Sequence, residues 1–149
     1  MEARFPLFVD LHGARAVLVG GGAVSARRAG VLLRFGANIT VIAPELHAPF
    51  PPEVVHLSRP YEAGDLAGAV LAVAATDSRA VNRSVGEEAR ERGIPVSVAD
   101  CPEECTFFFP AICEGGDLIA GVVSKSGDHR GVAAAAAAIR RMWEEDGWK

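Results

Sequence analysis

Short apolar runs alternate with stretches of helical spacing through the first hundred residues of the chain. The run at 16–19 ends in three glycines, and apolar side chains then recur with a helical period over the next dozen residues. Gly36 suits the left-handed residue that ends many helices, and the β-rich run 38–42 follows it. The pattern predicts a βαβ unit.

The same alternation continues as far as residue 98. Prolines punctuate a loop after the second strand, and the apolar runs beyond it are short and continuous, as in strands buried on both faces. We expect strands at 54–57, 70–74 and 95–98, and a helix that Asp77 or Ser78 caps and that runs to Arg92. Strands that alternate with helices form a parallel sheet, so residues 1–112 are predicted to be a Rossmann-like, doubly wound α/β domain.

The hydrophobic pattern changes after the last of these strands. Two apolar runs, Phe107–Phe109 and Leu118–Val123, flank the stretch Cys113–Asp117, which is typical of a hairpin. Six alanines from Ala133 onward then lead into a strongly helix-forming segment. We predict a small antiparallel hairpin followed by a helix over residues 113–149, and the small alanine side chains favour close approach of another helix in a dimer.

Composition narrows the class of protein. A formal net charge of −4 lacks the positive field that DNA or RNA binding usually needs, so we expect no nucleic-acid partner. The first ten residues do not resemble a signal peptide, and no apolar run approaches the roughly 20 residues that span a bilayer. Cys101, Cys105 and Cys113 are spaced too irregularly for a disulfide framework or a zinc site. These features favour the reducing cytoplasm, away from membranes.

The three glycines belong to the segment Gly20–Ser25, which matches the dinucleotide-binding pattern G-x-G-x-x-G with serine in the third glycine position. A glycine triplet alone is commonly only a turn, but this one lies between a predicted strand and a predicted helix. Gly20 permits the tight turn, and Gly22 lets the backbone approach a pyrophosphate at the helix N-terminus. The pattern predicts NAD binding by Gly20, Gly21, Gly22, Ala23 and Val24.

The carboxyl ends of two other strands supply further cofactor-binding candidates, because doubly wound sheets bind their ligands there. Ala43 and Pro44 follow the second strand, where an acidic residue would mark NAD. Since Glu45 comes only later, the choice between NAD and NADP stays open. The stretch Ala75, Thr76 and Asp77 follows the fourth strand. There Thr76 can offer its hydroxyl to the cofactor, while Asp77 can instead cap the next helix.

Asp100 ends the fifth predicted strand and so belongs to the same crevice. A carboxylate at this place can accept a proton from a substrate held against the nicotinamide. On spacing alone, an ordinary loop acid is the commoner explanation. Asp100 is therefore the candidate catalytic residue, with that alternative kept open.

A second candidate group precedes the last helix. It combines small and cationic side chains: Ser124, Lys125, Ser126, His129 and Arg130. The start of that helix could hold an anionic group, and a solvated helix start is the alternative. These five residues are the candidate substrate-binding group, and no metal-binding residue is predicted.

Taken in order, these residues closely resemble the precorrin-2 dehydrogenase and sirohydrochlorin ferrochelatase family, the N-terminal module of siroheme synthase. The resemblance covers nearly the whole chain. Several ordered motifs together are more specific than any one of them. The segments that carry it are Pro6–Phe8, Val17–Gly22 with Arg27–Ala29, Thr40–Pro44, Ala74–Asp77 with Val81 and Asn82, and Pro102–Glu103 through Phe109–Ala111.

The resemblance implies a homodimeric enzyme that oxidises the tetrapyrrole precorrin-2 to sirohydrochlorin with NAD⁺. Many relatives also insert Fe²⁺ into the product. Asp100 matches the family's catalytic aspartate and could serve both steps, because each of them removes protons from the macrocycle. The group at 124–130 would anchor the carboxylates of the tetrapyrrole.

The sequence departs from its relatives at several places. Ser97 and Cys101 stand where many relatives have Asn and Asp or Ala, and the stretch Lys125–Gly131 replaces one usually rich in Gly, Ser and Pro. The small helical domain that follows the dimerisation helix in many relatives is also missing. These departures favour an alternative: a binding module that senses NAD(H) or a tetrapyrrole without turnover.

Overall fold

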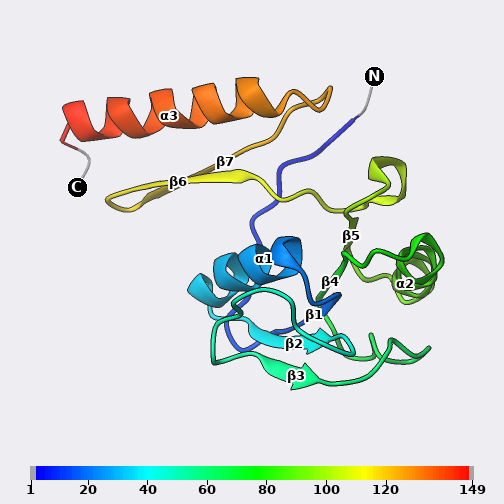
Figure 1. The fold of residues 1–149 in the computed structure, drawn as a ribbon. Helices are drawn as coiled ribbons and strands as arrows, with labels where there is room; N and C mark the ends of the chain where they lie inside the picture. The colour runs from blue at the N-terminus through cyan, green and yellow to red at the C-terminus, as the bar shows by residue number, and fades with distance from the viewer. Residues whose placement is uncertain (1–2, 148–149) are drawn as a thin grey trace. The chain divides into compact units, whose positions relative to one another are not determined.

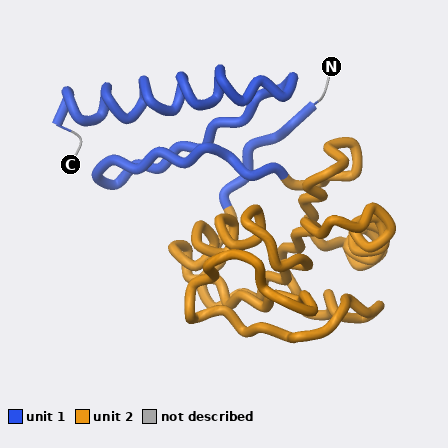
Figure 2. The backbone as a smooth tube through the Cα atoms, in the orientation of Figure 1, with its two compact units in different colours: residues 1–8, 108–149 blue, residues 9–107 orange. Residues whose placement is uncertain are grey.

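The computed structural model describes residues 3–147, and the chain divides into two compact units (Figure 2). One unit is Val9–Phe107, and the other joins the start of the chain, up to Phe8, to everything from Phe108 onward. The predicted domain ranges, 1–112 and 113–149, place a boundary between residues 112 and 113, and their outer ends fall outside the described residues.

A parallel five-stranded sheet forms the centre of the unit Val9–Phe107 (Figure 1). Its strands lie in the order β3-β2-β1-β4-β5. They are β1 (Arg15–Val19), β2 (Asn38–Ile42), β3 (Val55–Leu57), β4 (Leu71–Ala74) and β5 (Val96–Val98). The crossovers after β1 and β4 carry the helices α1 (Ala23–Arg34) and α2 (Arg79–Glu91). The predicted α/β class with a Rossmann-like sheet is confirmed.

The sheet is covered on both faces, because neighbouring side chains of its central strand are equally buried. Val17 and Val19 of β1 belong to a core that also contains Val85 and Ala89 of α2. Leu18 points to the opposite face, since side chains alternate along a strand, and it is also 0% exposed. Strands buried on both sides read as continuous apolar runs, which is why the sequence revealed them.

The order of the strands creates a topological switch point at one edge of the sheet. From β1 the chain passes through α1 to β2 on one side, and from β4 it passes through α2 to β5 on the other. The carboxyl ends of β1 and β4 are therefore neighbours whose connections diverge. In open α/β sheets, ligands bind at such a switch point.

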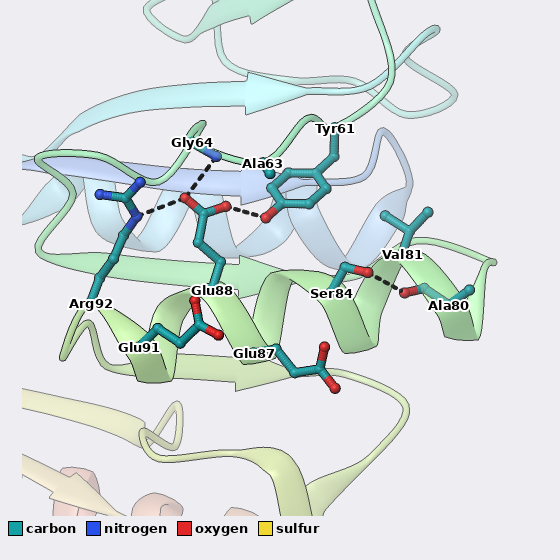
Figure 3. Close-up of a pocket in the computed structure, with 10 residues that line it drawn as sticks. All are labelled: Tyr61, Ala63, Gly64, Ala80, Val81, Ser84, Glu87, Glu88, Glu91 and Arg92. Atoms are coloured by element: carbon teal, nitrogen blue, oxygen red, sulfur yellow. Dashed lines mark hydrogen bonds and ion pairs between the residues drawn. The ribbon is translucent and has the colours of Figure 1, made fainter.

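The segment between β3 and β4 contains turns rather than a helix, and two carboxylates anchor it. Asp65 accepts hydrogen bonds from both terminal nitrogens of Arg59, at 2.8 and 2.7 Å. Glu88 of α2 accepts one from the Tyr61 hydroxyl and one from the Gly64 amide (Figure 3). A groove of about 790 Å³ lies beside this contact. Because Glu88 is already satisfied by its neighbours, we assign it a structural role.

The unit that contains the chain from Phe108 onward has a hairpin and a long helix. The strands β6 (Ala111–Gly115) and β7 (Leu118–Val122) pair antiparallel, with Gly115 opposite Leu118. The helix α3 (His129–Glu145) follows. The predicted hairpin and helix are confirmed, but Phe107–Phe109 is not its first strand. A two-residue turn with Gly116 at φ +54° closes the pairing early, so the partner of β7 is the stretch predicted as a loop.

Helix α3 packs on this hairpin through a few contacts with residues of β6. The Cys113 thiol is buried and donates to the carbonyl of Ala136 at 3.5 Å. Gly115 lies against the Trp143 ring, where a Cβ would come within 2.7 Å of a ring carbon. Arg140 donates to the carbonyl of Ile112 at 2.6 Å. Ala136 is the one buried residue within α3, so most of the helix surface remains uncovered in this chain.

Candidate functional site

Gly20 makes the turn that leaves β1. Its φ of +124° lies in a region that L side chains rarely adopt, and a Cβ there would clash with the carbonyl oxygen of Ala75. The Gly20 amide donates to the carbonyl of Ile42 at 2.9 Å. The turn therefore packs directly between the ends of β2 and β4, and glycine is required by the fold itself.

Gly21 brings the segment after β2 onto the same turn. A Cβ at Gly21 would clash with the carbonyl oxygen of Glu45, and the His47 amide donates to the carbonyl of Gly21 at 2.8 Å. Ala43 and Pro44, the candidates at the end of β2, are each fixed by a hydrogen bond at the backbone carbonyl. Nε2 of His56 lies 2.8 Å from the carbonyl oxygen of Ala43, and the Ser58 hydroxyl donates to the carbonyl of Pro44 at 2.9 Å.

Gly22 differs from both, because space surrounds it. It is the N-cap of α1, no side chain caps the helix, and its first turn contains no acidic residue. A Cβ on Gly22 would meet no other atom within 4 Å. The first N–H groups of a helix, here those of Ala23 and Val24, have no partner inside the helix. This end of α1 thus offers open space, unpaired donors and a positive dipole end, which suit a phosphate.

The other two α-helices begin differently. Ser78 caps α2 by accepting from the Val81 amide at 3.3 Å, so the cap is Ser78 rather than Asp77. Asp128 caps α3 by accepting from the Gly131 amide at 2.9 Å. At α3 a carboxylate of the chain already stands where an anion would bind. Among the described α-helices, only α1 presents an uncapped N-terminus.

Ser25, in the third glycine position of the motif, is fully buried. Its side chain is 0% exposed, and its hydroxyl has no hydrogen-bond partner. The small side chain preserves close packing of α1, as the sequence led us to expect. The unpaired hydroxyl is a cost of the serine at this position.

The end of β4 is shaped by a residue that sequence reasoning gave no site role. The hydroxyl of Thr76 donates to Oδ1 of Asn82 at 2.7 Å, and Asn82 is 0% exposed. The only proton of the Thr76 hydroxyl is thus used within the protein. A polar residue on the buried face of an amphipathic helix is the signal that could have identified Asn82.

Asp100 lies just past the end of β5, at the same edge of the sheet. Its side chain is 37% exposed, and its Oδ1 accepts from Nη1 of Arg79 at 2.7 Å. Nη2 of the same arginine pairs with Glu104, in the short 3₁₀ helix Pro102–Glu104. No role was predicted for Arg79 or Glu104, because both contacts join residues more than twenty positions apart.

The substrate-binding candidates lie together in the unit that contains the hairpin and α3. Ser124 organises their loop, because its hydroxyl accepts from the amides of Ser126 and Asp128 at 3.0 and 2.9 Å. Lys125, Ser126, His129 and Arg130 are all exposed. Ser124, Lys125 and Ser126 thus lie in the loop before α3, and His129 and Arg130 are the first two residues of that helix, in a different unit from Asp100.

The unit Val9–Phe107, in contrast, brings all of its candidates to one edge of the sheet. The glycine turn follows β1, Ala43 and Pro44 follow β2, Ala75–Asp77 follow β4, and Asp100 follows β5. These residues fit a dinucleotide: an open phosphate position at α1 lies beside the end of β4, where a reactive ring would approach. The donor set at α1 consists of backbone N–H groups, so it places no demand on side-chain identity.

No helix within residues 3–147 is long and apolar enough to cross a membrane. Among the same residues, no group of three or more His, Cys, Asp or Glu side chains is arranged to hold a metal ion.

Comparison with solved structures finds the same fold in SirC, a precorrin-2 dehydrogenase. The two chains superpose with a TM-score of 0.76 at 21% sequence identity, over 94% of this chain and 71% of that one. At this identity the likeness concerns the fold, including the added hairpin and helix.

Curated relatives are more similar in sequence and much longer. A "Probable multifunctional siroheme biosynthesis protein HemA" of Ruminiclostridium josui is 42% identical over 148 residues, which is 95% of this chain and 29% of that protein. A "Siroheme synthase" of Azotobacter vinelandii is 44% identical over 128 residues, which is 83% of this chain and 27% of the synthase. The chain therefore spans less than a third of the relatives that it matches.

A family model described as "Putative NAD(P)-binding" matches residues 7–111. The match includes every strand of the parallel sheet and every candidate residue at its carboxyl edge. It confirms the dinucleotide-binding class that the glycine motif predicted, and its description names both NAD and NADP. The chain belongs to this NAD(P)-binding family.

Proposed function

We propose that this chain is an NAD-dependent precorrin-2 dehydrogenase, which oxidises precorrin-2 to sirohydrochlorin in the synthesis of siroheme. The observation that carries the proposal is the pairing, at one sheet edge, of an uncapped helix N-terminus at Gly22 with a half-exposed carboxylate at Asp100. The names of its relatives, siroheme synthase and siroheme biosynthesis protein, support this choice of substrate over other oxidoreductase substrates.

Each part of the edge has a defined task in this proposal. The backbone N–H groups at the start of α1 bind the pyrophosphate, and the small residues Ala43 and Ala75 flank the cofactor. Bound NAD⁺ supplies a hydride acceptor. Oxidation of a C–C single bond of the substrate releases one hydride and one proton. Asp100 accepts the proton, which requires an ionised carboxylate within hydrogen-bond reach of the substrate.

The unit that contains the hairpin and α3 supplies substrate binding and assembly. Lys125, His129 and Arg130 are exposed and basic, and they suit the carboxylates on the rim of a tetrapyrrole. Large apolar side chains of the same unit are also exposed, including Phe5 at 86%, Leu7 at 74% and Met142 at 49%. Uncovered apolar surface of this kind marks an interaction site, and we propose a cytoplasmic homodimer formed through this unit.

The test is the absorbance of NADH when the purified protein meets precorrin-2 and NAD⁺ under nitrogen. The parent is expected to form NADH, while Asp100→Asn binds NAD⁺ normally and forms NADH only at a small residual rate. Asp117→Asn, which changes an exposed aspartate in the turn between β6 and β7, is the matched control and should behave as the parent. Equal turnover by parent and Asp100→Asn would show that Asp100 takes no part in the reaction.

The same experiment separates the enzyme from a sensor module. NAD⁺ binding by calorimetry together with no NADH from the parent would contradict the dehydrogenase and identify a binding module. Fe²⁺ insertion, in which iron is a substrate, is tested separately by adding Fe²⁺ to the protein with sirohydrochlorin and following the tetrapyrrole spectrum. We expect Asp100 to receive the pyrrole protons in that step.

A further inference from the structure

Arg79 joins the ends of two neighbouring strands. It is the first residue of α2 and comes directly after the segment 75–78 at the end of β4. Its Nη1 donates to Oδ1 of Asp100, past the end of β5, at 2.7 Å. One guanidinium thus links the segment predicted to contact the cofactor with the candidate catalytic carboxylate.

Glu104 holds this arginine from the other side. Its carboxylate accepts from Nη2 of Arg79, and its backbone carbonyl accepts from Nη2 of Arg90, near the end of α2. The Glu104 side chain is only 25% exposed. Two arginines on one helix therefore fix the segment that follows Asp100, and the planar fork of Arg79 is held in one orientation between two carboxylates.

The contact engages one oxygen of Asp100 and leaves the other open. Within residues 3–147, Oδ1 accepts from Arg79, and Oδ2 accepts no hydrogen bond. A proton acceptor needs a fixed direction and a free lone pair, and this arrangement supplies both. Ion pairs as exposed as this one add little to folding stability, so stability alone does not account for the arrangement.

We propose that Arg79 is a positioning residue for Asp100, with Glu104 as its anchor. The inference rests on the proposed function, because it assumes that Asp100 accepts the substrate proton. Arg79 does not touch the substrate. It fixes the orientation of the carboxylate and so directs Oδ2 toward the substrate at the ends of β4 and β5.

The kinetic test compares Arg79→Ala and Arg79→Lys in the full chain. Arg79→Ala is expected to lower kcat about 10- to 100-fold, the loss typical of a misplaced reacting group, with the Kd for NAD⁺ unchanged. Arg79→Lys should recover part of kcat, because it restores the charge but not the fork. Arg83→Ala is the control: Arg83 lies one turn further along α2 and pairs with Glu87 at 3.3 Å instead.

The double variant decides whether Arg79 acts through Asp100. If it does, Arg79→Ala costs nothing further in the Asp100→Asn background. An additional loss there, or the parent's kcat in Arg79→Ala alone, would overturn the inference. If the parent itself forms no NADH, the proposed function is wrong, and this outcome is distinct from a failure of the role proposed for Arg79.

A second measurement needs no turnover. Hydrogen exchange of the segment 99–105 should become faster in Arg79→Ala and in Glu104→Gln, since each removes a side-chain contact between Arg79 of α2 and this segment, and should stay at the parent's rate in Arg83→Ala. Unchanged exchange in both of the first two variants would show that Arg79 does not hold the segment. This result stands whichever substrate the protein takes.

Discussion

Asn82 of α2 holds Thr76, at the end of β4, through three hydrogen bonds. Its Oδ1 accepts from the amide and the hydroxyl of Thr76 at 2.9 and 2.7 Å, and its Nδ2 donates to the carbonyl at 3.0 Å. The amide side chain thereby continues the hydrogen bonding of the sheet beyond the last residue of the strand. It fixes the backbone of the predicted cofactor segment against the helix that follows.

Replacing Asn82 with alanine should therefore affect stability and cofactor binding together. The change leaves partly buried groups of Thr76 unpaired, and we expect a loss of about 2–3 kcal/mol in the free energy of unfolding. NAD⁺ should bind more weakly because the segment 75–77 is released. Urea unfolding and calorimetric titration measure the two effects. Ser84→Ala, an exposed serine on the same helix, should change neither, and normal NAD⁺ binding by Asn82→Ala would contradict the second expectation.

Two glycines of the turn allow its role in stability and its role in NAD⁺ binding to be tested separately. Gly20→Ala introduces a Cβ against the carbonyl of Ala75 at a φ of +124°, so it should lower stability markedly or prevent folding. Gly22 has an extended φ of −93°, and a Cβ there meets nothing. Gly22→Ala should fold with a loss below about 1 kcal/mol, the usual cost of alanine at an N-cap. Its methyl group occupies the proposed pyrophosphate position, so its Kd for NAD⁺ should rise at least tenfold.

Thermal unfolding and NAD⁺ titration of both variants test this contrast. A Gly22→Ala protein that binds NAD⁺ as tightly as the parent would show that the open space at α1 is not the phosphate site. A Gly20→Ala protein with the parent's stability would show that the turn can shift to admit a Cβ.

The sequence was sufficient for the parts of the site that the backbone makes. The glycine turn and the strand ends follow from local apolar runs and from glycine positions, which act over a few residues. The hairpin shows the limit of this reasoning: apolar content favoured Phe107–Phe109 as a strand, but the two-residue turn at Gly116 decided the pairing.

Side-chain contacts across elements could not be predicted in the same way. Arg79 meets Asp100 only because α2 begins beside the end of β5, and many arginines on the chain would have been equal candidates. Asn82 was visible as a polar residue on a helix face, but its partner was not. Such pairs depend on the docked geometry of the sheet and helices, which the local pattern does not contain.

Ser25→Ala should stabilise the protein, which is unusual for a change at a motif position. The hydroxyl is buried without a partner, so its removal relieves a desolvation cost, and we expect a gain of about 1 kcal/mol. Ser97→Ala is the contrasting variant, because the Ser97 hydroxyl accepts from Nη1 of Arg28 at 2.9 Å and its loss should destabilise. Urea unfolding of both proteins measures the difference. Destabilisation of Ser25→Ala would show that the hydroxyl has a role in the folded state.

Asp65 should make the stability of the protein sensitive to acid. Its hydrogen bonds from Arg59 hold the pKa of the carboxyl below its usual value, and its side chain is only 12% exposed. Because the folded state binds this proton less readily than the unfolded chain, the stabilisation is complete above the ordinary Asp pKa and is lost as the pH falls through the lowered value.

Asp65→Asn should consequently be less stable than the parent at neutral pH, by about 1–3 kcal/mol, and the gap should narrow below pH 4 or so. Arg59→Gln should reproduce the same profile, because it removes the partner that lowers the pKa of Asp65. Urea unfolding between pH 7 and pH 3 gives the curves for the three proteins. If the free energy of unfolding falls in parallel for all three proteins as the pH is lowered, the Asp65–Arg59 pair does not cause the loss of stability in acid. If both variants become as stable as the parent at low pH, the pair between β3 and β4 accounts for that loss.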